Sequence, residues 1–318
     1  MKYYIIHLKK THPMAIPTSR TKEPGTITID AEKCDGCGLC ITVCGDNSLV
    51  LTDGKVTANP SPIFGCIGCG HCMAICPHDA IMITGRTISP GDMFPLPASG
   101  ETAGYDSYLN LLKRRRSMRK FQKKPVEPHL IEKILEAAVS TPMGLPPSDV
   151  NVLVFDSVEK SRQFVTDFCN MLEKMKWFVS PWFLALMRPF WGKANDELFR
   201  GFIRPLFSIY PESLKRGENA ITYDAPLVMY FYGSPWADPA DPIIAATAAM
   251  YAGESLGLGT CMLGAEHPFL QNSGARKLRE KYGIRYKSRE GLLVIFGYPA
   301  IKYRKGIRRT FASVTTYS

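Results

Sequence analysis

Early in the sequence, apolar and polar positions form short alternating runs. The runs at 26–29 and 80–84 predict strands, because successive side chains of a strand point to opposite faces. The segment 48–57 predicts a hairpin, since Asp53-Gly54 is a favoured two-residue turn. This part of the chain is therefore expected to be small and rich in strands.

Later in the sequence, helical periodicity alternates with nearly continuous apolar runs. One helix is expected to begin at Tyr105 and a second at Pro128, because proline favours the first helical turn. A third is expected with Asp241 as its N-cap, Pro242 at its first position and Gly257 past its end. The apolar runs predict buried strands at 151–155, 226–232 and 291–297. The mixture indicates an α+β protein with long helices between strands.

The stretch 160–222 differs from its surroundings because it is unusually aromatic. Three of the four Trp residues lie within 175–192. Such a segment fits a helical hairpin buried against the core or a partner subunit. It also fits an aromatic lid over an active site, or a helix that contacts a membrane surface. All three interpretations remain open at this point.

Eight of the ten cysteines lie close together near the N-terminus, in two runs with identical spacing. Each run reads C-x2-C-x2-C-x3-C, and the second continues into Pro77. This is the spacing of bacterial proteins that hold two [4Fe–4S] clusters, in which the fourth cysteine of each run ligates the other cluster. The predicted ligand sets are Cys34, Cys37, Cys40 and Cys76 for one cluster, and Cys66, Cys69, Cys72 and Cys44 for the other.

Zinc and disulfides are the competing explanations for these cysteines. Zinc sites usually pair two C-x2-4-C hooks across a longer spacer, which three successive steps of three residues fit poorly. Disulfide frameworks belong to short secreted chains, and no signal peptide is apparent. Gly45 follows the first run where proline is usual, and His71 is expected to be a surface residue rather than a ligand. Cys169 and Cys261 are expected to be small buried apolar residues.

Length and composition set the broad class of the protein. The 318 residues predict about two domains, and an apolar content of 45% is typical of a soluble globular protein. No apolar stretch reaches the roughly 20 residues that span a bilayer, and free thiols with clusters indicate a reducing cytoplasm. The expected divisions are a flexible arm at 1–25, a two-cluster ferredoxin domain at 26–84, a linker at 85–104 and a second domain at 105–318 that contains the aromatic insert.

The net charge of +10 has several possible meanings. The cations could simply cover a solvated surface, or they could attract an anionic cofactor or an acidic protein such as a ferredoxin or flavodoxin. Nucleic acid is not expected to be a partner, because no helix-turn-helix, zinc-finger or RNA-binding motif is present. Six of the cations fall within 113–120. Arginine forks around the Ser117 hydroxyl are suitable donors for a phosphate, although neither a P-loop nor a dinucleotide-binding glycine motif occurs.

The basic segment and three later ones together resemble the FMN-dependent nitroreductase family. Each motif alone is weakly specific, but the four occur in the family's order and spacing and cover about 105–318, the aromatic insert excepted. They are RRSMRKFQKKPV (115–126), STPMGLPPSD (140–149), AGESLGLGTCMLG (252–264) and GYPAIKYRKGIRR (297–309).

The resemblance implies a fold and a set of FMN contacts. The fold would be a nitroreductase-like sandwich, with a mainly antiparallel sheet flanked by helices, in a homodimer whose FMN sites lie between the subunits. Pro146 departs from the family, which commonly has Asn there. The implied cofactor-binding residues are Arg115, Arg116, Ser117 and Arg119 near the phosphate, ribityl chain and ring edge, Pro142, Met143 and Gly144 from the other subunit, Met262, Leu263 and Gly264 along the ring, and Arg308 or Arg309 at the phosphate.

Two clusters and an FMN on one chain suggest how electrons would flow. An external low-potential donor would reduce the clusters, the clusters would fill the FMN, and the FMN would reduce a nitroaromatic, quinone or activated alkene. One alternative is a flavoprotein that oxidises NAD(P)H and sends electrons out through the clusters. Another is a non-catalytic electron relay or redox sensor with a sequestered flavin. No catalytic acid can be named from the sequence.

Overall fold

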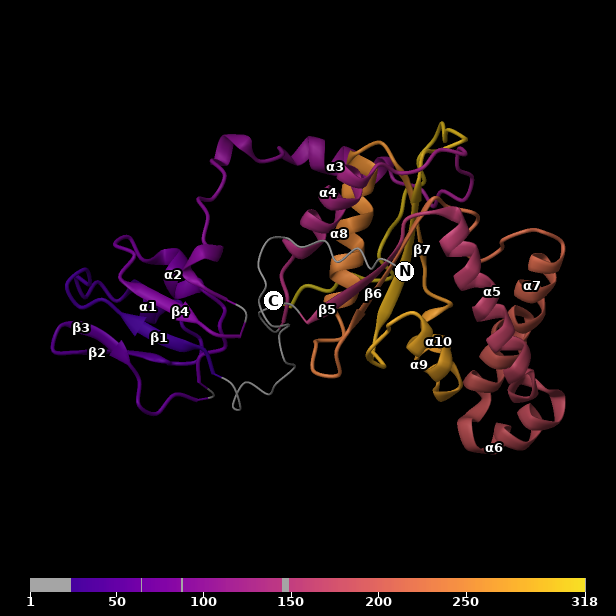
Figure 1. The fold of residues 1–318 in the computed structure, drawn as a ribbon, viewed down its shortest axis with the longest axis horizontal. Coiled ribbons are helices and arrows are strands. Elements are labelled where there is room, and N and C mark those ends of the chain that lie inside the picture. The colour runs from indigo at the N-terminus through magenta and orange to yellow at the C-terminus, as the bar shows by residue number, and fades with distance from the viewer. Residues whose placement is uncertain (1–23, 64, 87, 145–148, 318) are drawn as a thin grey trace.

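The computed structural model describes residues 24–63, 65–86, 88–144 and 149–317. A small N-terminal module lies beside a larger body of helices and sheet, and an extended segment joins the two (Figure 1). Nearly all of the expected N-terminal arm lies outside the described residues, as does Pro146.

The N-terminal module consists of two short antiparallel strand pairs and two short helices. Strand β1 (Thr26–Ile29) pairs with β4 (Ile81–Thr84), and β2 (Leu49–Thr52) pairs with β3 (Lys55–Ala58). The turn between β2 and β3 has positive φ at both central residues, 50° at Asp53 and 75° at Gly54, as the hairpin prediction requires. The predicted strands and hairpin are therefore confirmed.

Two one-turn helices carry the cysteine runs of the module. They are α1 (Leu39–Thr42) and α2 (His71–Ile75), and each follows a glycine in the left-handed conformation. Leu49, Val56 and Ile83 pack with Cys34, Cys40 and Cys72 in the interior. The cysteine sites are therefore part of the module's core.

The larger body is built on one antiparallel sheet with the strand order β5-β6-β8-β7. Its strands are β5 (Val150–Phe155), β6 (Leu227–Gly233), β7 (Gly259–Leu263) and β8 (Gly291–Gly297). Every residue of β6 and β8 is buried, which explains why both read as continuous apolar runs. Three of the four strands were predicted, and β7 is the additional one.

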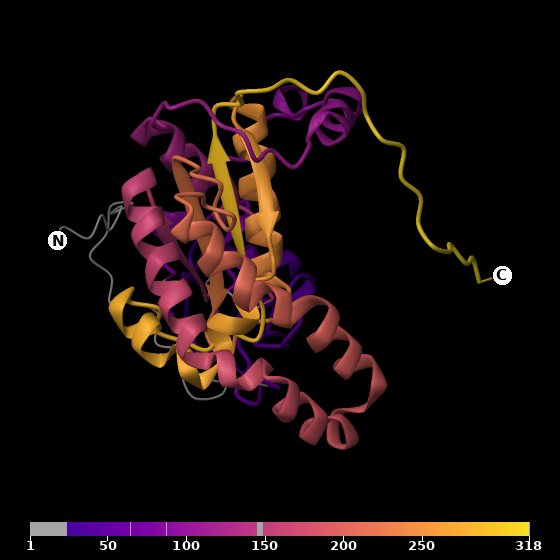
Figure 2. The same ribbon diagram turned by 90° about the vertical axis from the view of Figure 1, so that its right-hand side faces the viewer.

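Helices cover both faces of this sheet (Figure 2). One core contains residues of α4 (Pro128–Val139) and α8 (Asp241–Ser255). The core on the other face contains residues of α5 (Val158–Met175), α7 (Arg204–Lys215), α9 (His267–Gln271) and α10 (Arg276–Lys281). The expected sandwich of an antiparallel sheet between helices is therefore confirmed.

The connections at the ends of the body are long. The segment after β4 contains two short turns, η1 (Pro90–Asp92) and η2 (Ser99–Glu101), before α3 (Tyr105–Arg114) begins at the predicted residue. At the other end, residues 300–317 are all exposed and run outward from the body as an extended tail (Figure 2).

The aromatic segment forms a projecting helical arm. It contains η3 (Lys176–Val179), α6 (Pro181–Leu198) and the π-helical turn η4 (Phe199–Ile203), and it extends away from the sheet (Figures 1 and 2). Trp191 stacks on Phe199 with ring centroids 4.5 Å apart, but Trp182 and Phe190 are 62% and 78% exposed. The arm therefore packs mainly on itself, and the expectation of burial against the chain's own core is wrong for most of α6.

The start of α8 corrects one prediction. The helix begins at Asp241 and its N-cap is Ala240, so Asp241 occupies the first turn rather than the cap. Its carboxylate accepts a hydrogen bond from the Gly144 N–H at 2.9 Å instead of capping its own helix. The side chain thus serves a contact with a segment far away in sequence, which local capping rules cannot reveal.

Among the described residues, no helix has both the length and the apolar character needed to cross a membrane.

Candidate functional site

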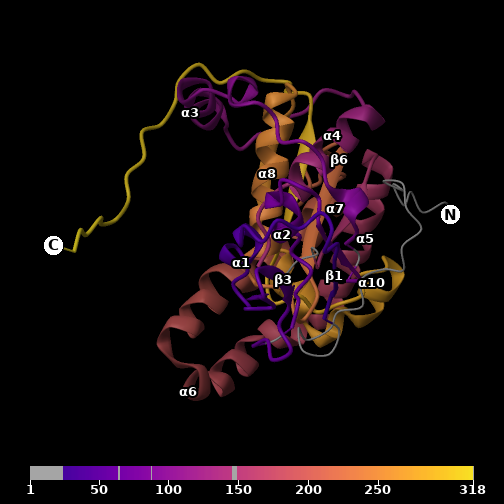
Figure 3. The same cartoon turned by 90° about the vertical axis from the view of Figure 1, so that its left-hand side faces the viewer.

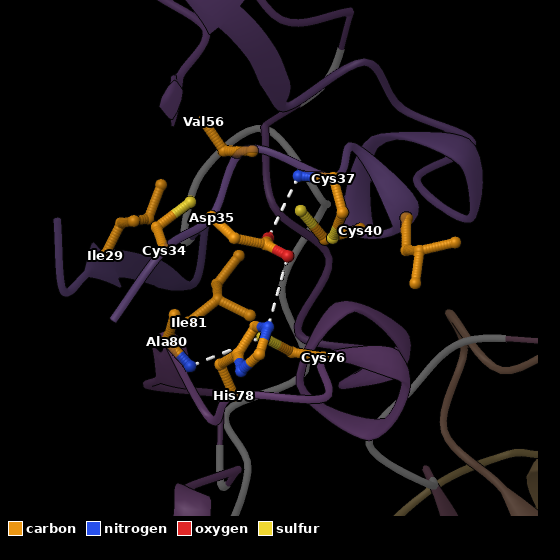
Figure 4. A pocket seen from close by; sticks show the side chains of 11 residues that line it. Ile29, Cys34, Asp35, Cys37, Cys40, Val56, Cys76, His78, Ala80 and Ile81 are labelled. Atoms are coloured by element: carbon orange, nitrogen blue, oxygen red, sulfur yellow. Dashed lines mark hydrogen bonds and ion pairs between the residues drawn. The ribbon is translucent and has the colours of Figure 1, made fainter. Parts of the chain in front are cut away.

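The first cavity of the N-terminal module is lined by Cys34, Cys37, Cys40 and Cys76 (Figure 4). Three of these come from the first run, and Cys76 comes from the end of the second. This is the set that the spacing predicted. The other lining residues are mostly apolar and all belong to the module, namely Ile29, Asp35, Leu39, Val56, His78, Ala80 and Ile81.

Hydrogen bonds fix the loop around this first cavity. The Asp35 carboxylate accepts from the Cys37 N–H at 3.0 Å and lies 3.1 Å from His78 Nε2 (Figure 4). Hydrogen bonding from Cys37, with a smaller contribution from His78, lowers the pKa of Asp35. The Ala80 N–H donates to Cys76 Sγ at 3.3 Å. Such bonds to a ligating sulfur influence the reduction potential of an iron–sulfur cluster.

Gly36 is the position in this loop that tolerates no side chain. Its φ is +77°, and a Cβ there would lie 2.1 Å from the Gly54 carbonyl oxygen in the β2–β3 turn. The backbone of the first cysteine run therefore packs directly against the β2–β3 hairpin, and this contact fixes how close the two can approach.

The second cavity is lined by the other four cysteines, Cys44, Cys66, Cys69 and Cys72, and has a volume of about 440 Å³. Burial raises the pKa of the Cys66 thiol, and it raises that of Cys72 to about 12. Thiols whose pKa is raised stay protonated near neutral pH until a metal displaces the proton. His71 is exposed, as expected, and lies at the rim of this cavity.

The two cavities differ in what surrounds them. All residues lining the first belong to the N-terminal module, whereas Met143 and Gly144 of the larger body complete the wall of the second. Figure 3 views the molecule from the side of the module, with α1 and α2 in front of the sheet. The second cysteine set therefore lies where the two parts of the molecule meet.

The cysteine arrangement fits iron–sulfur cubes better than the alternatives. A zinc ion needs all its sulfurs at about 2.3 Å from one point, and in the described residues no three His, Cys, Asp or Glu side chains converge in that way. All ten cysteines are unpaired, so no disulfide framework is formed. Four thiols line each of two cavities, which is the number of ligands that one [4Fe–4S] cluster takes, one thiolate to each iron.

The basic segment after α3 lies along strand β7. Ser117 forms a parallel bridge with Thr260, and the Met118 N–H donates to the Thr260 carbonyl at 2.8 Å. The Glu254 carboxylate accepts from both the backbone N–H and the hydroxyl of Thr260, at 3.1 and 2.8 Å. Burial raises the pKa of Glu254, and the positive charges of Arg115 and Arg114 partly offset this. These contacts hold the basic segment against the strand that carries the predicted flavin contacts.

The arginines of this segment are available for an anion. In the described part of the chain, Arg115, Arg116 and Arg119 form no ion pair with a carboxylate. Arg115 is only 9% exposed, and the buried Nε of Arg116 has no partner among the described residues. A buried guanidinium nitrogen without a partner, in a cationic segment without a paired carboxylate, fits a phosphate group, which would supply both the acceptor and the opposite charge.

The remaining predicted contacts lie at different distances from this segment. A Cβ on Gly306 would be 2.6 Å from Arg116 Nη2, so Gly306 lies beside the basic segment. Arg308 and Arg309 follow two and three residues later, and both are exposed. On β7, Leu263 is buried and Met262 is 45% exposed. Gly264 follows directly after the strand.

Pro142, Met143 and Gly144 are not brought to the basic segment within one chain. Gly144 is bonded to Asp241 at the start of α8, whereas Glu254 and the basic segment lie at its end. Asp241 and Glu254 are about 20 Å apart at the rise of an α-helix. One chain therefore presents the two predicted halves of the flavin site at opposite ends of α8.

Sequence reasoning did not single out two carboxylates of the body, the half-buried Glu254 and the buried Glu266. Glu254 lies inside a motif that was noticed for other residues. Glu266 follows β7, is 2% exposed, and accepts a hydrogen bond from the Tyr210 hydroxyl at 3.3 Å. Burial raises its pKa to about 7. No sequence signal marks Glu266, because only the packing of α7 over the sheet buries it.

Comparison with known proteins adds two family matches. Residues 112–298 match the model of the nitroreductase family, and residues 26–77 match that of the 4Fe-4S dicluster domain. No curated protein matches the chain.

Several solved structures are similar to the chain. A nitroreductase with bound FMN from Bacteroides fragilis is 19% identical, with 66% of this chain and 97% of that one covered and a TM-score of 0.45. A nitroreductase with bound FMN from Desulfitobacterium hafniense is 20% identical over 66% and 97%, with a TM-score of 0.43. A BluB-like flavoprotein from Clostridium difficile is 15% identical over 66% and 98%, with a TM-score of 0.45.

Proposed function

Since the chain belongs to the nitroreductase family, we propose that it is an FMN-dependent oxidoreductase fed by its own pair of [4Fe–4S] clusters. An external low-potential donor, such as a ferredoxin or flavodoxin, reduces the clusters. The electrons continue to the flavin site and from there to a nitroaromatic, a quinone or an activated alkene.

One observation carries this proposal. The second four-cysteine cavity is completed by Met143 and Gly144, which belong to a predicted flavin-binding segment of the reductase body. If the module worked independently of the reductase, a cysteine set would not be expected to lie against that segment. The contact gives electrons a short path from one part of the molecule to the other.

Several residues of the larger body would bind and orient the FMN. FMN accepts electrons singly and delivers them as a hydride, which is the chemistry that joins clusters to an organic acceptor. Arg115, Ser117 and Arg119 would contact the phosphate, ribityl chain and ring edge of FMN, with Arg116 beside them and Arg308 or Arg309 completing the phosphate site. Glu254 holds β7 in register with this segment. The half-exposed Met262 would line the ring on the side where an acceptor would bind.

We propose that the working form is a homodimer, in which each flavin site takes its basic segment from one subunit and residues 142–144 from the other. The separation of these segments by the length of α8 supports this arrangement. The exposed tail also supports it, because Ile307, Phe311 and Val314 are apolar side chains that a second subunit would cover. We expect the dimer to act in the cytoplasm, where its thiols stay reduced.

The proposal is tested by removing one cluster ligand and changing only the source of electrons. Cys76→Ala removes a thiol from the first cavity. Turnover driven by reduced ferredoxin should then be lost, while the chemically reduced flavin should still reduce a nitroaromatic or quinone at the unaltered rate. If ferredoxin-driven turnover were unchanged in Cys76→Ala, the clusters would not supply the flavin and the proposal would fail.

The direction of electron flow is tested separately by stopped-flow spectroscopy of the unaltered protein. Bleaching of the flavin band by reduced ferredoxin, with no bleaching by NADH or NADPH, is the expected result. Rapid bleaching by NADH or NADPH would support the alternative in which electrons leave through the clusters.

A further inference from the structure

We propose that the second cysteine set delivers its electrons across the subunit interface, to the flavin site whose basic segment belongs to the other copy of the chain. This inference rests on the proposed function, because it needs clusters and FMN in one dimer. It adds which cluster is the last before the flavin, and which flavin that cluster serves.

The two cysteine sets differ in which of them adjoins the body. The first cavity is enclosed by the N-terminal module alone, and its lining residues end at Ile81. The second shares a wall with the body through Met143 and Gly144. Electrons that enter the module therefore leave it from the set formed by Cys44, Cys66, Cys69 and Cys72.

Met143 and Gly144, which form the shared wall, are attached to the body by several contacts. The Gly144 N–H donates to the Asp241 carboxylate at 2.9 Å, and Asp241 is 2% exposed. A Cβ on Gly144 would lie 2.9 Å from the Asp238 Cβ. Met143 packs against the core that contains α4 and α8. The segment 142–144 is thus tied to the start of α8 and places the second cysteine set at that end of the helix.

Residues 142–144 lie far from the basic segment of their own chain. Arg115 and Ser117 lie by Thr260 and Glu254, at the far end of α8 and about 20 Å from Asp241 along the helix axis. A flavin that contacts residues 142–144 of one chain cannot at the same time be anchored by the basic segment of that chain. The flavin beside the second cysteine set is therefore the one anchored by the other copy.

The electron balance of this route is simple. Two reduced one-electron donors are oxidised for each FMN reduced, and the two electrons pass one at a time through the second cluster. The flavin takes up two protons from water in the same process. No other reductant or co-reactant is required.

Two kinds of mixed dimer distinguish this route from transfer within one chain. Cys72→Ser removes the second cluster, and Arg115→Ala with Arg119→Ala removes the flavin anchor. In the split dimer, one chain carries Cys72→Ser and the other carries the two arginine changes. In the joined dimer, one chain carries all three changes and its partner is unaltered. Two different affinity tags allow each mixed dimer to be purified, and each should bind one FMN per dimer.

The measured quantity is the bleaching of bound flavin after mixing with reduced ferredoxin, together with the FMN content. The split dimer keeps a second cluster in one chain and a flavin anchor in the other, so its single FMN should bleach at a rate close to that of the unaltered dimer. In the joined dimer the only cluster and the only anchor are in the same chain, and bleaching should be at least about ten-fold slower.

The reverse pattern, with fast bleaching in the joined dimer only, would overturn the inference and leave the proposed function intact. Equal rates in both mixed dimers would also overturn it. Failure of the unaltered dimer to bind FMN or to bleach with ferredoxin would instead overturn the proposed function. Misfolding of the module in Cys72→Ser does not confuse these outcomes, because a misfolded module is also one without its second cluster.

Discussion

In the N-terminal module, all eight candidate ligands come from two short runs, and within each run the cysteines are three or four positions apart. In the larger body, the candidate flavin residues come from the basic segment, from β7 and from the chain near Gly306. Backbone pairing and the half-buried Glu254 carboxylate hold the basic segment and β7 together. The module thus builds its sites from local spacing, and the body builds its site from distant segments. A single change in the module should therefore remove a site entirely, whereas a change in the body should weaken one by degrees.

The largest effect is expected from Gly36→Ala in the module. The new Cβ would lie 2.1 Å from the Gly54 carbonyl oxygen, so the first cysteine loop could not rest on the hairpin. The first cluster should be lost and the iron content should fall by about half, from roughly eight to roughly four atoms per chain. Iron analysis of the anaerobically reconstituted protein measures this.

Gly38→Ala is the matched control for that change. Gly38 has a similar φ of +74°, but nothing lies within 4 Å of its Cβ position. Both variants carry the left-handed strain of about 1–2 kcal/mol, and only Gly36→Ala carries the clash. Equal iron contents in the two variants would show that backbone conformation, rather than the contact with the hairpin, decides whether the loop holds a cluster.

A smaller and graded effect is expected from Arg115→Ala in the body. Loss of one buried charge-assisted contact should weaken FMN binding by about 1.5–3 kcal/mol, or roughly ten- to a hundred-fold. Binding of riboflavin, which lacks the phosphate, should change much less. Fluorescence titration of the flavin-free protein measures both affinities.

Lys123→Ala is the control, because it removes an exposed cation a few residues away. It should leave FMN affinity nearly unchanged, and neither variant should lose iron. An iron content that fell together with FMN affinity in Arg115→Ala would contradict the idea that the two sites are assembled independently.

The smallest effect concerns Glu266→Gln and appears only as a pH dependence. Burial raises the pKa of Glu266 from its ordinary value of 4.5 to about 7. The folded state therefore favours the neutral acid, and the carboxyl group lowers stability progressively as pH rises from about 4.5 to about 7. Gln keeps a neutral side chain beside Tyr210. The variant should be more stable than the unaltered protein at pH 8, by on the order of 2 kcal/mol, and nearly equal to it at pH 5.

Denaturant unfolding followed by circular dichroism at the two pH values measures this difference. Glu280→Gln serves as the control, since Glu280 is an exposed carboxylate paired with Arg276. A stability gain for Glu266→Gln that was the same at pH 5 and pH 8 would show that packing, and not ionisation, is responsible.

Most of the fold could be predicted from local patterns. Strands β6 and β8 were recognisable because each is buried on both faces. Strand β7 was missed because Gly259 and Thr260 look like the end of a helical turn, and only pairing with β8 makes the segment a strand. Asp241 was misassigned as an N-cap for the same kind of reason, since its partner Gly144 is distant in sequence.

The cysteine spacing by itself determined how the thiols are divided between two sites, because in this pattern three thiols of one tight loop share a cavity and the fourth thiol of the run reaches the other one. The run of cations at 113–120 likewise identified the basic segment as a candidate anion site from the sequence alone. The tertiary structure alone decided that the second cysteine set, rather than the first, adjoins the reductase body through Met143 and Gly144. It alone decided that residues 142–144 and the basic segment stand at opposite ends of α8. Contacts between distant segments depend on how whole elements pack, and no local pattern of residues shows which segments lie against the two ends of a helix.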